Sequence, residues 1–185
     1  MTPDVIGPGS MTPDSIASEL REARDDFHQL LDRASPWELR QRSDGTRWTN
    51  RQLLFHMLFG YLLVRNLLWL VRAFARLPDR WSRGFAAGLD AATRPFHVVN
   101  YVGSLGGAAV LGHRRMERVM DRVTGSLIGT LERSSEQQLA RGMHFPVGWD
   151  PYFRDYMTVQ DVLHYATQHY RHHRRQLTLR DAHDG

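Results

Sequence analysis

The sequence contains no cysteine and no lysine. The absence of cysteine excludes disulfides, zinc ribbons, iron–sulfur clusters and a protein thiol as nucleophile. Any thiol chemistry must therefore use a small-molecule thiol. All 24 basic residues are arginine, a bias that we attribute to a GC-rich genome of actinobacterial type rather than to function.

The excess of positive charge is small and spread along the chain. The formal net charge is +4, and 20 acidic residues are interspersed among the arginines. Arginines on the solvated faces of amphipathic helices account for this pattern, so we expect no nucleic-acid partner. The two denser groups are Arg114, Arg115, Arg118 and Arg122, and Arg171, Arg174 and Arg175.

One apolar stretch, residues 53–77, is long enough to raise the question of a membrane span. It carries His56, Arg65 and Arg72 in its interior, and such groups are costly at the centre of a bilayer. We therefore expect a buried core helix, no membrane association and a cytoplasmic protein.

Helix signals run along most of the sequence, and no alternating pattern indicates a strand. Three helix starts have capping residues, at Thr12-Pro13, at Thr49 with Gln52, and at Thr158 with Asp161. Residues 78–95 form an irregular excursion with room for a short helix. The sequence therefore predicts an all-α four-helix bundle with long connections between helices. The predicted helices span residues 12–34, 50–76, 96–133 and 158–180.

Two histidines near the C-terminus, His169 and His173, are four residues apart. On a helix such residues lie one above the other, with Cβ atoms roughly 5–6 Å apart, so both imidazoles can bind one metal ion. They share a helical stripe with Val162, Ala166 and Leu177, which indicates that both face the core.

A third histidine, His56, lies on a core-facing stripe of the second predicted helix. A lone histidine on an apolar face is usually a core residue with a hydrogen-bond partner. Three of them are harder to explain in this way, because each unpaired buried polar group costs about 1–3 kcal/mol. One shared metal ion accounts for all three. His164 and His172 point away from the stripe, and we expect them in solvent or at a helix interface.

Three neutral imidazoles suit Zn²⁺ best, with Ni²⁺ or Fe²⁺ as alternatives, and leave positions open for water or substrate. Such a metal lowers the pKa of a bound water or thiol and polarises a substrate oxygen. A zinc protease would need glutamate where Tyr170 stands. A di-iron site would need Glu-x-x-His pairs, whereas the sequence offers Asp25-x-x-His28 and Asp161-x-x-His164. We disfavour both classes.

The sequence contains three further motifs, Trp48-Thr49, Leu53-Leu54-Phe55-His56-Met57 and His169-x-x-x-His173-Arg174-Arg175-Gln176-Leu177. Their order and spacing resemble those of the DinB-like superfamily of metal-binding four-helix bundles. The resemblance implies that His56, His169 and His173 bind a divalent metal. Arg175 stands where the family commonly has a small residue, so the floor of the site can differ.

The same superfamily includes mycothiol-dependent maleylpyruvate isomerases and bacillithiol transferases, in which the metal activates the sulfur of a small thiol. The resemblance therefore implies a thiol-dependent S-transferase or isomerase, with a mycothiol-type cosubstrate and an electrophilic small-molecule substrate. The alternative is a non-catalytic, stress-associated bundle that binds a metal, a small ligand or a protein partner.

We expect one DinB-like helical bundle domain over residues 12–180 and a C-terminal tail over 181–185. Residues 1–11 are expected to be a disordered N-terminal or appended segment, because their opening Met-Thr-Pro-Asp recurs from Met11. Two questions stay open. The aromatic stretch 145–156 either walls a pocket or packs across the bundle, and the apolar second helix either forms a homodimer seam or is buried within the monomer.

Overall fold

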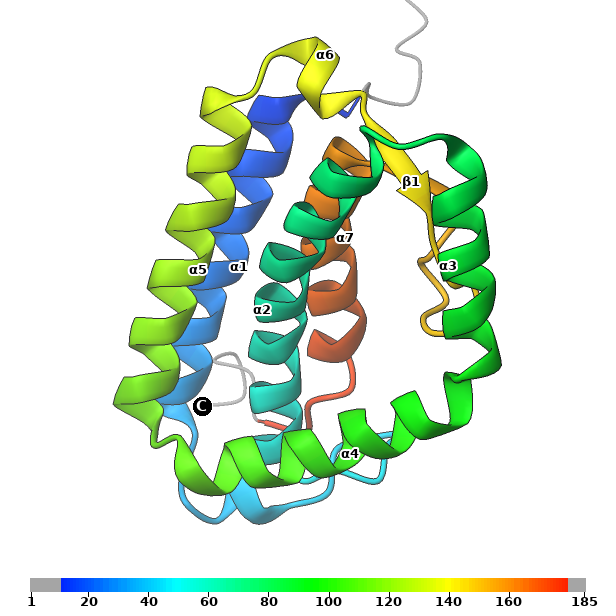
Figure 1. The fold of residues 1–185 in the computed structure, drawn as a ribbon. Helices are drawn as coiled ribbons and strands as arrows, with labels where there is room; N and C mark the ends of the chain where they lie inside the picture. Colours follow the sequence, from blue (N-terminus) through cyan, green and yellow to red (C-terminus); the bar gives the residue numbers. More distant parts are fainter. Residues whose placement is uncertain (1–10, 180–185) are drawn as a thin grey trace, which may run out of the picture.

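The computed structural model describes residues 11–179, so the expectations for the segments 1–11 and 181–185 fall almost entirely outside the described residues. The helices are α1 (Pro13–Arg33), α2 (Asn50–Phe74), α3 (Asp79–Ala91), α4 (Thr93–Val110), α5 (His113–Arg133), α6 (Glu136–Leu139) and α7 (Val159–Arg174), with a 3-10 turn at Glu38–Arg40. The strands are β1 (Gly142–His144) and β2 (Tyr156–Thr158), which pair antiparallel. Figure 1 shows α1, α2, α5 and α7 as an upright bundle, which confirms the predicted fold class.

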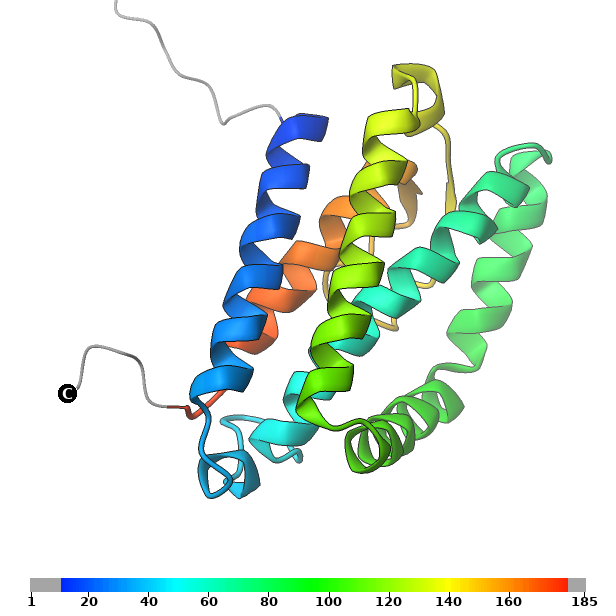
Figure 2. The ribbon, with the colours of Figure 1, turned by 90° about the vertical axis from the view of Figure 1, so that its left-hand side faces the viewer.

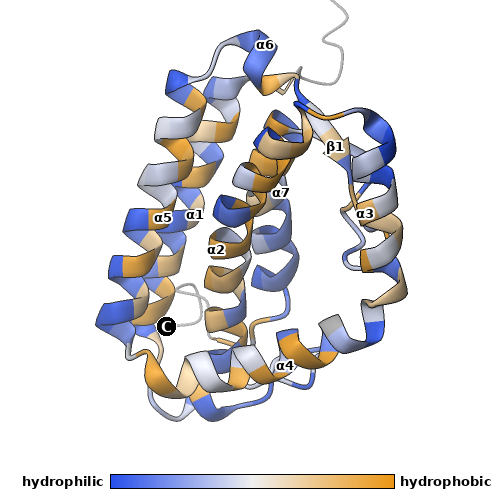
Figure 3. Ribbon diagram, in the orientation of Figure 1, coloured by the Kyte–Doolittle hydropathy of each residue, from blue (hydrophilic) through white to orange (hydrophobic). Residues whose placement is uncertain are grey.

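The four bundle helices form a ring in which α1 and α2 each pack against both α5 and α7. Figure 2 shows the same arrangement from the side of α1 and α5. Side chains such as Leu20, Phe27, Leu54, Met120 and Leu127 fill the core and are completely buried. Figure 3 shows that polar residues alternate with apolar ones along α1 and α5, as expected for amphipathic helices whose apolar stripe faces a core.

Three predicted helix starts are confirmed, because each is set by local hydrogen bonds. The side chains of Thr12, Thr49 and Thr158 each accept the backbone N–H of the residue three positions later, and the residue at that position bonds back to the cap. These capping boxes satisfy donors that a helix leaves unpaired in its first turn.

The predicted third helix, residues 96–133, is wrong in its extent. The chain forms two helices there, α4 and α5, which separate at Leu111 and Gly112. Figure 1 shows the reason: α4 lies across the end of the bundle, and α5 turns to run along it. The excursion before α4 holds a full helix, α3, rather than a short one.

Two further expectations need correction. The last helix ends at Arg174 instead of continuing to residue 180, because Thr178 leaves the helical path to bond with Asn50 on α2. The chain also contains strand, since β1 and β2 pair over three residues each. Strands this short show no period that a sequence could reveal.

By length and composition alone, α2 could cross a membrane. Its position is that of a core helix, since it packs against α4, α5 and α7. Phe55, Tyr61 and Val64 are buried, whereas Trp69 is 71% exposed. The monomer therefore covers only part of the predicted dimer seam, whose Phe59, Leu62, Leu70 and Phe74 are half-buried, and a homodimer stays a prediction.

Candidate metal centre

The structure brings together the three histidines that the sequence singled out. His56 projects from α2, and His169 and His173 project from the adjacent α7. One nitrogen of each ring lies within 4.8 Å of the others, and the three residues could hold a metal ion. His56 and His169 are buried, while His173 is half-buried and borders an opening. Two rigid neighbouring helices thus position all three rings.

Polar neighbours fix the proton of two of these rings on Nδ1. The Ser104 hydroxyl donates to the carbonyl of Asn100 at 2.9 Å, so its oxygen is left to accept from His56 Nδ1 at 3.3 Å. Gln176 Oε1 accepts from His173 Nδ1 at 2.7 Å. Such outer hydrogen bonds orient metal-binding imidazoles in many proteins. They leave Nε2 of both rings unprotonated, with a lone pair that can bind a metal ion.

These two Nε2 atoms face each other at 3.2 Å. Burial, followed by the charge of His173, lowers the pKa of His56 to about 3. Burial also lowers the pKa of His173 to about 4, with the bond to Gln176 opposing the effect. Both rings are therefore neutral at pH 7, and two lone pairs point at one another. A cation placed between them would replace this repulsion with coordination, so the residues fit a divalent metal.

His169 occupies a space that only glycine provides. A Cβ atom at position 60 would lie 2.5 Å from His169 Nδ1 and 2.7 Å from Cε1. The Nδ1 atom is buried, and no hydrogen-bond partner for it is found among residues 11–179. Burial and then the other histidines lower the pKa of His169 well below 6.5. The His169 ring is thus a neutral imidazole that can bind a metal ion, and it packs against the backbone of Gly60 on α2.

Aromatic rings cover the exposed side of the cluster. The Trp48 ring stacks on His56, with centroids 4.3 Å apart, and meets His173 edge-on at 6.4 Å. Tyr101 also stacks with Trp48, with ring centroids 6.2 Å apart. This stack fixes the His56 plane and keeps the ring from solvent.

A carboxylate lies beside the histidines. Asp150 lines the same small pocket as His56 and His169. The Tyr165 hydroxyl donates to Asp150 Oδ2 at 2.9 Å. Burial raises the pKa of Asp150, although the Tyr152 N–H and the Tyr165 hydroxyl partly oppose this. Burial and the neighbouring carboxylate raise the pKa of Tyr165 well above 10, so its hydroxyl remains a donor.

The aromatic stretch 145–156 supplies one wall of this pocket, through Trp149, Asp150 and Phe153. This confirms that it lines a pocket rather than only packing across the bundle. The pocket has a volume of about 40 Å³, enough for a small number of water molecules.

A wider opening of about 350 Å³ lies on the His173 side. It is bordered by the loop 45–48 and by Asn100 and Tyr101 of α4, and its size falls in the range of small-molecule sites. Asn100 lines both spaces. The histidines therefore separate a water-sized pocket from one that can admit an organic molecule.

The remaining histidines of α7 lie outside the cluster, as expected. His164 Nε2 is 3.3 Å from a Glu19 oxygen on α1, and His172 Nδ1 is 3.3 Å from the Tyr152 hydroxyl. Arg175 is exposed beyond the end of α7, so the departure from the family's small residue does not reach the rings.

Gly60, Ser104 and Asp150 escaped the sequence analysis, and Gln176 appeared there only within the motif that carries the family resemblance. Gly60 had a signal, because it lies one helical turn after His56. Ser104 lies in the glycine-rich segment 103–107, where Gly107 permits a close approach to Phe55. Asp150 carried no local signal, because its role depends on how a long connection folds back.

A family model described as the DinB superfamily matches residues 19–177. The chain belongs to the DinB superfamily. Among solved structures, this DinB protein is similar to YfiT from Bacillus subtilis, described as a probable metal-dependent hydrolase with an unusual four-helix bundle topology. The two share 15% sequence identity with a TM-score of 0.62, over 96% of this chain and 90% of YfiT. At this identity the likeness shows the fold alone. No curated protein matches the sequence.

Proposed function

We propose that His56, His169 and His173 hold one divalent metal ion and that this DinB protein is a metal-dependent enzyme acting on a small molecule. The observation that carries the proposal is the convergence of three neutral imidazoles, two with Nε2 atoms 3.2 Å apart. Zn²⁺ suits three nitrogen donors best, with Ni²⁺ or Fe²⁺ as alternatives. When bound, the metal would supply Lewis acidity toward an oxygen or sulfur atom.

The chain's own residues would handle the proton and the substrate. Asp150, with its raised pKa, is placed to accept a proton from a nucleophile in the small pocket, since a base is most effective when its pKa approaches the working pH. The Tyr165 hydroxyl holds the carboxylate in position. The wider opening beside His173 and Tyr101 would bind the organic part of the substrate.

We propose a small-molecule thiol, of mycothiol type, as the nucleophile and S-transfer or isomerisation of an electrophile as the reaction. The superfamily assignment and the size of the wider opening support this choice, and the absence of cysteine is compatible with it. A cytoplasmic location, where such thiols stay reduced, and a homodimer belong to the same proposal.

Hydrolysis is the second candidate, with water as the nucleophile. The water-sized pocket between Asp150 and the rings of His56 and His169 favours it. The description of YfiT as a probable metal-dependent hydrolase agrees with it. The two candidates share the metal and differ in the nucleophile.

Metal analysis tests the shared part of the proposal. Protein purified without a histidine tag should carry about one divalent ion per chain by elemental analysis, and His56→Ala should lose it. His164→Ala is the matched control, because it removes an imidazole from α7 outside the cluster. Wild-type protein without stoichiometric metal, or His56→Ala with its metal intact, would contradict the proposal.

Turnover then separates the nucleophiles. The metal-loaded protein is incubated with mycothiol and a generic electrophile, and separately with activated esters and amides in the absence of thiol. Metal-dependent conjugation supports thiol transfer, and metal-dependent ester or amide cleavage supports hydrolysis. A metal-loaded protein that accelerates neither reaction would favour the non-catalytic bundle.

A further inference from the structure

A further pocket lies at the other end of the bundle from the histidines. It has a volume of about 310 Å³, within the lower range of small-molecule sites. It is formed where α2 and α5 end and α7 begins. We name it the arginine pocket, and it is lined by Arg72, Arg76, Thr130, Arg133, Ser134, Gln138, Arg141 and Val159.

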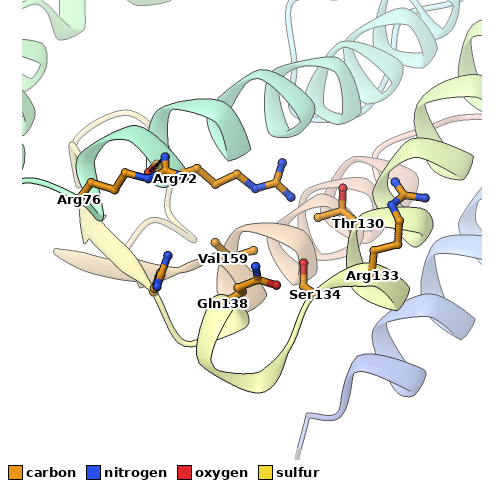
Figure 4. A pocket seen from close by; sticks show the side chains of 8 residues that line it. Arg72, Arg76, Thr130, Arg133, Ser134, Gln138 and Val159 are labelled. Atoms are coloured by element: carbon orange, nitrogen blue, oxygen red, sulfur yellow. Dashed lines mark hydrogen bonds between the residues drawn. The ribbon is translucent and has the colours of Figure 1, made fainter.

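Four arginines from three parts of the chain line this pocket. Arg72 and Arg76 come from the end of α2, Arg133 from the end of α5, and Arg141 from the segment after α6. Figure 4 shows the Arg72 side chain extending toward Thr130, with Ser134 and Gln138 on another wall. The convergence is thus a product of the tertiary fold, which explains why no basic stripe marks it in the sequence.

No carboxylate neutralises this charge. Within residues 11–179, none of the four arginines forms an ion pair, whereas Arg21, Arg154 and Arg171 are each paired with glutamate or aspartate. Arg76 Nη1 donates to the Arg72 backbone carbonyl at 2.9 Å, a contact that brings no carboxylate to either guanidinium. Like charges held together repel, so the arrangement favours an anion.

Neutral donors complete the pocket. Gln138 Oε1 already accepts the backbone N–H of Ser135 at 2.9 Å, so its Nε2 is the atom left to donate. Gly129 leaves room for the Arg133 guanidinium, since a Cβ there would lie 2.7 Å from Nη1. The helix dipole favours arginine near a helix C-terminus, and this effect explains the positions of Arg72 and Arg133. It does not account for Arg141, which follows α6 by two residues and faces the same space.

We propose that the arginine pocket binds a small anion of the diphosphate class. Guanidinium groups bind phosphate oxygens through paired hydrogen bonds, and four of them match a ligand that carries more than one acidic group. This is a second ligand site, independent of the metal-dependent activity proposed for the histidines. The substrate or effector that uses it would carry two linked phosphates, either free or as part of an organic molecule.

Calorimetric titration of the metal-loaded protein with inorganic diphosphate tests the proposal. At 0.15 M salt, where exposed charges farther apart than about 8 Å are largely screened, we expect saturable binding of one diphosphate per chain. Arg72→Gln and Arg133→Gln should each weaken it at least tenfold, which corresponds to about 1.4 kcal/mol. Arg118→Gln is the matched control: it removes the same charge from α5, where Arg118 bonds to the Arg114 carbonyl away from the pocket.

Two further arms identify what is bound and where. Citrate, which carries carboxylates in place of phosphates, should bind at least tenfold more weakly than diphosphate. His56→Ala should leave diphosphate binding unchanged, because the metal site is at the other end of the bundle. The proposal is overturned by non-saturable binding, by equal affinity in Arg72→Gln and Arg118→Gln, by citrate binding as tightly, or by loss of binding in His56→Ala. Thermal unfolding of each variant shows that it remains folded.

Discussion

Replacing Gly60 with alanine should disable the metal centre without unfolding the protein. The new Cβ would lie 2.5 Å from His169 Nδ1. Reaching an ordinary contact of 3.4 Å requires the ring or the helix to move by about 1 Å. Metal–nitrogen bonds tolerate little displacement, and a functional site needs its groups within about 0.5 Å of the productive geometry. We therefore expect Gly60→Ala to bind Zn²⁺ at least tenfold more weakly.

The effect on stability should be smaller than the effect on metal binding. Alanine inside a helix is favoured over glycine by about 1 kcal/mol. The forced contact in a packed core costs about 1–3 kcal/mol. The metal-free variant should therefore range from unchanged to about 2 kcal/mol less stable in urea unfolding.

The control is Gly125→Ala on α5, where a Cβ would meet nothing within 4 Å. It should gain up to about 1 kcal/mol of stability and keep its metal. Zn²⁺ affinity is measured by competition with a chromophoric chelator. If folded Gly60→Ala competes for Zn²⁺ as well as Gly125→Ala, the packing of His169 against Gly60 does not set the metal geometry, and the reasoning fails.

Three further predictions concern the same site. His56 and His173 have pKa values of about 3 and 4 in the fold and an ordinary value of 6.5, so acidification protonates the unfolded chain first. The metal-free protein should keep its full stability above pH 6.5 and lose it as the pH falls toward 4, and urea unfolding of His56→Leu should show a flatter pH dependence. Ser104→Ala removes the partner of His56 Nδ1 and should weaken Zn²⁺ binding by about 10–100-fold in the same chelator competition; an unchanged affinity would mean that Ser104 does not orient the ring. Asp150→Asn should lower kcat by about 10²–10⁴-fold while elemental analysis finds its metal content unchanged, and full activity in this variant would remove Asp150 as the base.

The sequence could predict features that depend on residues close to one another in the chain. Helix starts at Thr12, Thr49 and Thr158 were predicted correctly, because a capping box is complete within four residues. The pairing of His169 with His173 follows from the helical repeat in the same way. Predicting His56 as the third ligand required only the assumption that both helices turn their histidine-bearing faces toward the core.

Features that depend on the path of the connections could not be predicted. The break between α4 and α5 arises because α4 crosses the end of the bundle. The residues around Leu111 do not predict that change in direction. Ser104 and Asp150 reach the histidines from two such connections, so their roles appear only in three dimensions. The arginine pocket is a third example, since residues far apart in sequence meet at one end of the bundle.

The way α4 is held has a consequence for how the centre opens. Of the described side chains of α4, Ser104 and Ala108 are the buried ones, whereas the bundle helices bury long apolar stripes. A helix with so little buried apolar surface can detach at low free energy while the rest of the fold stays intact. Amide hydrogens of α4 should therefore exchange with solvent much faster than those of α2 and α7. Because Ser104 and Tyr101 lie on α4, each local opening would also remove Ser104 from His56 and the Tyr101 ring from Trp48. Entry of metal would then depend on the local unfolding of this one helix.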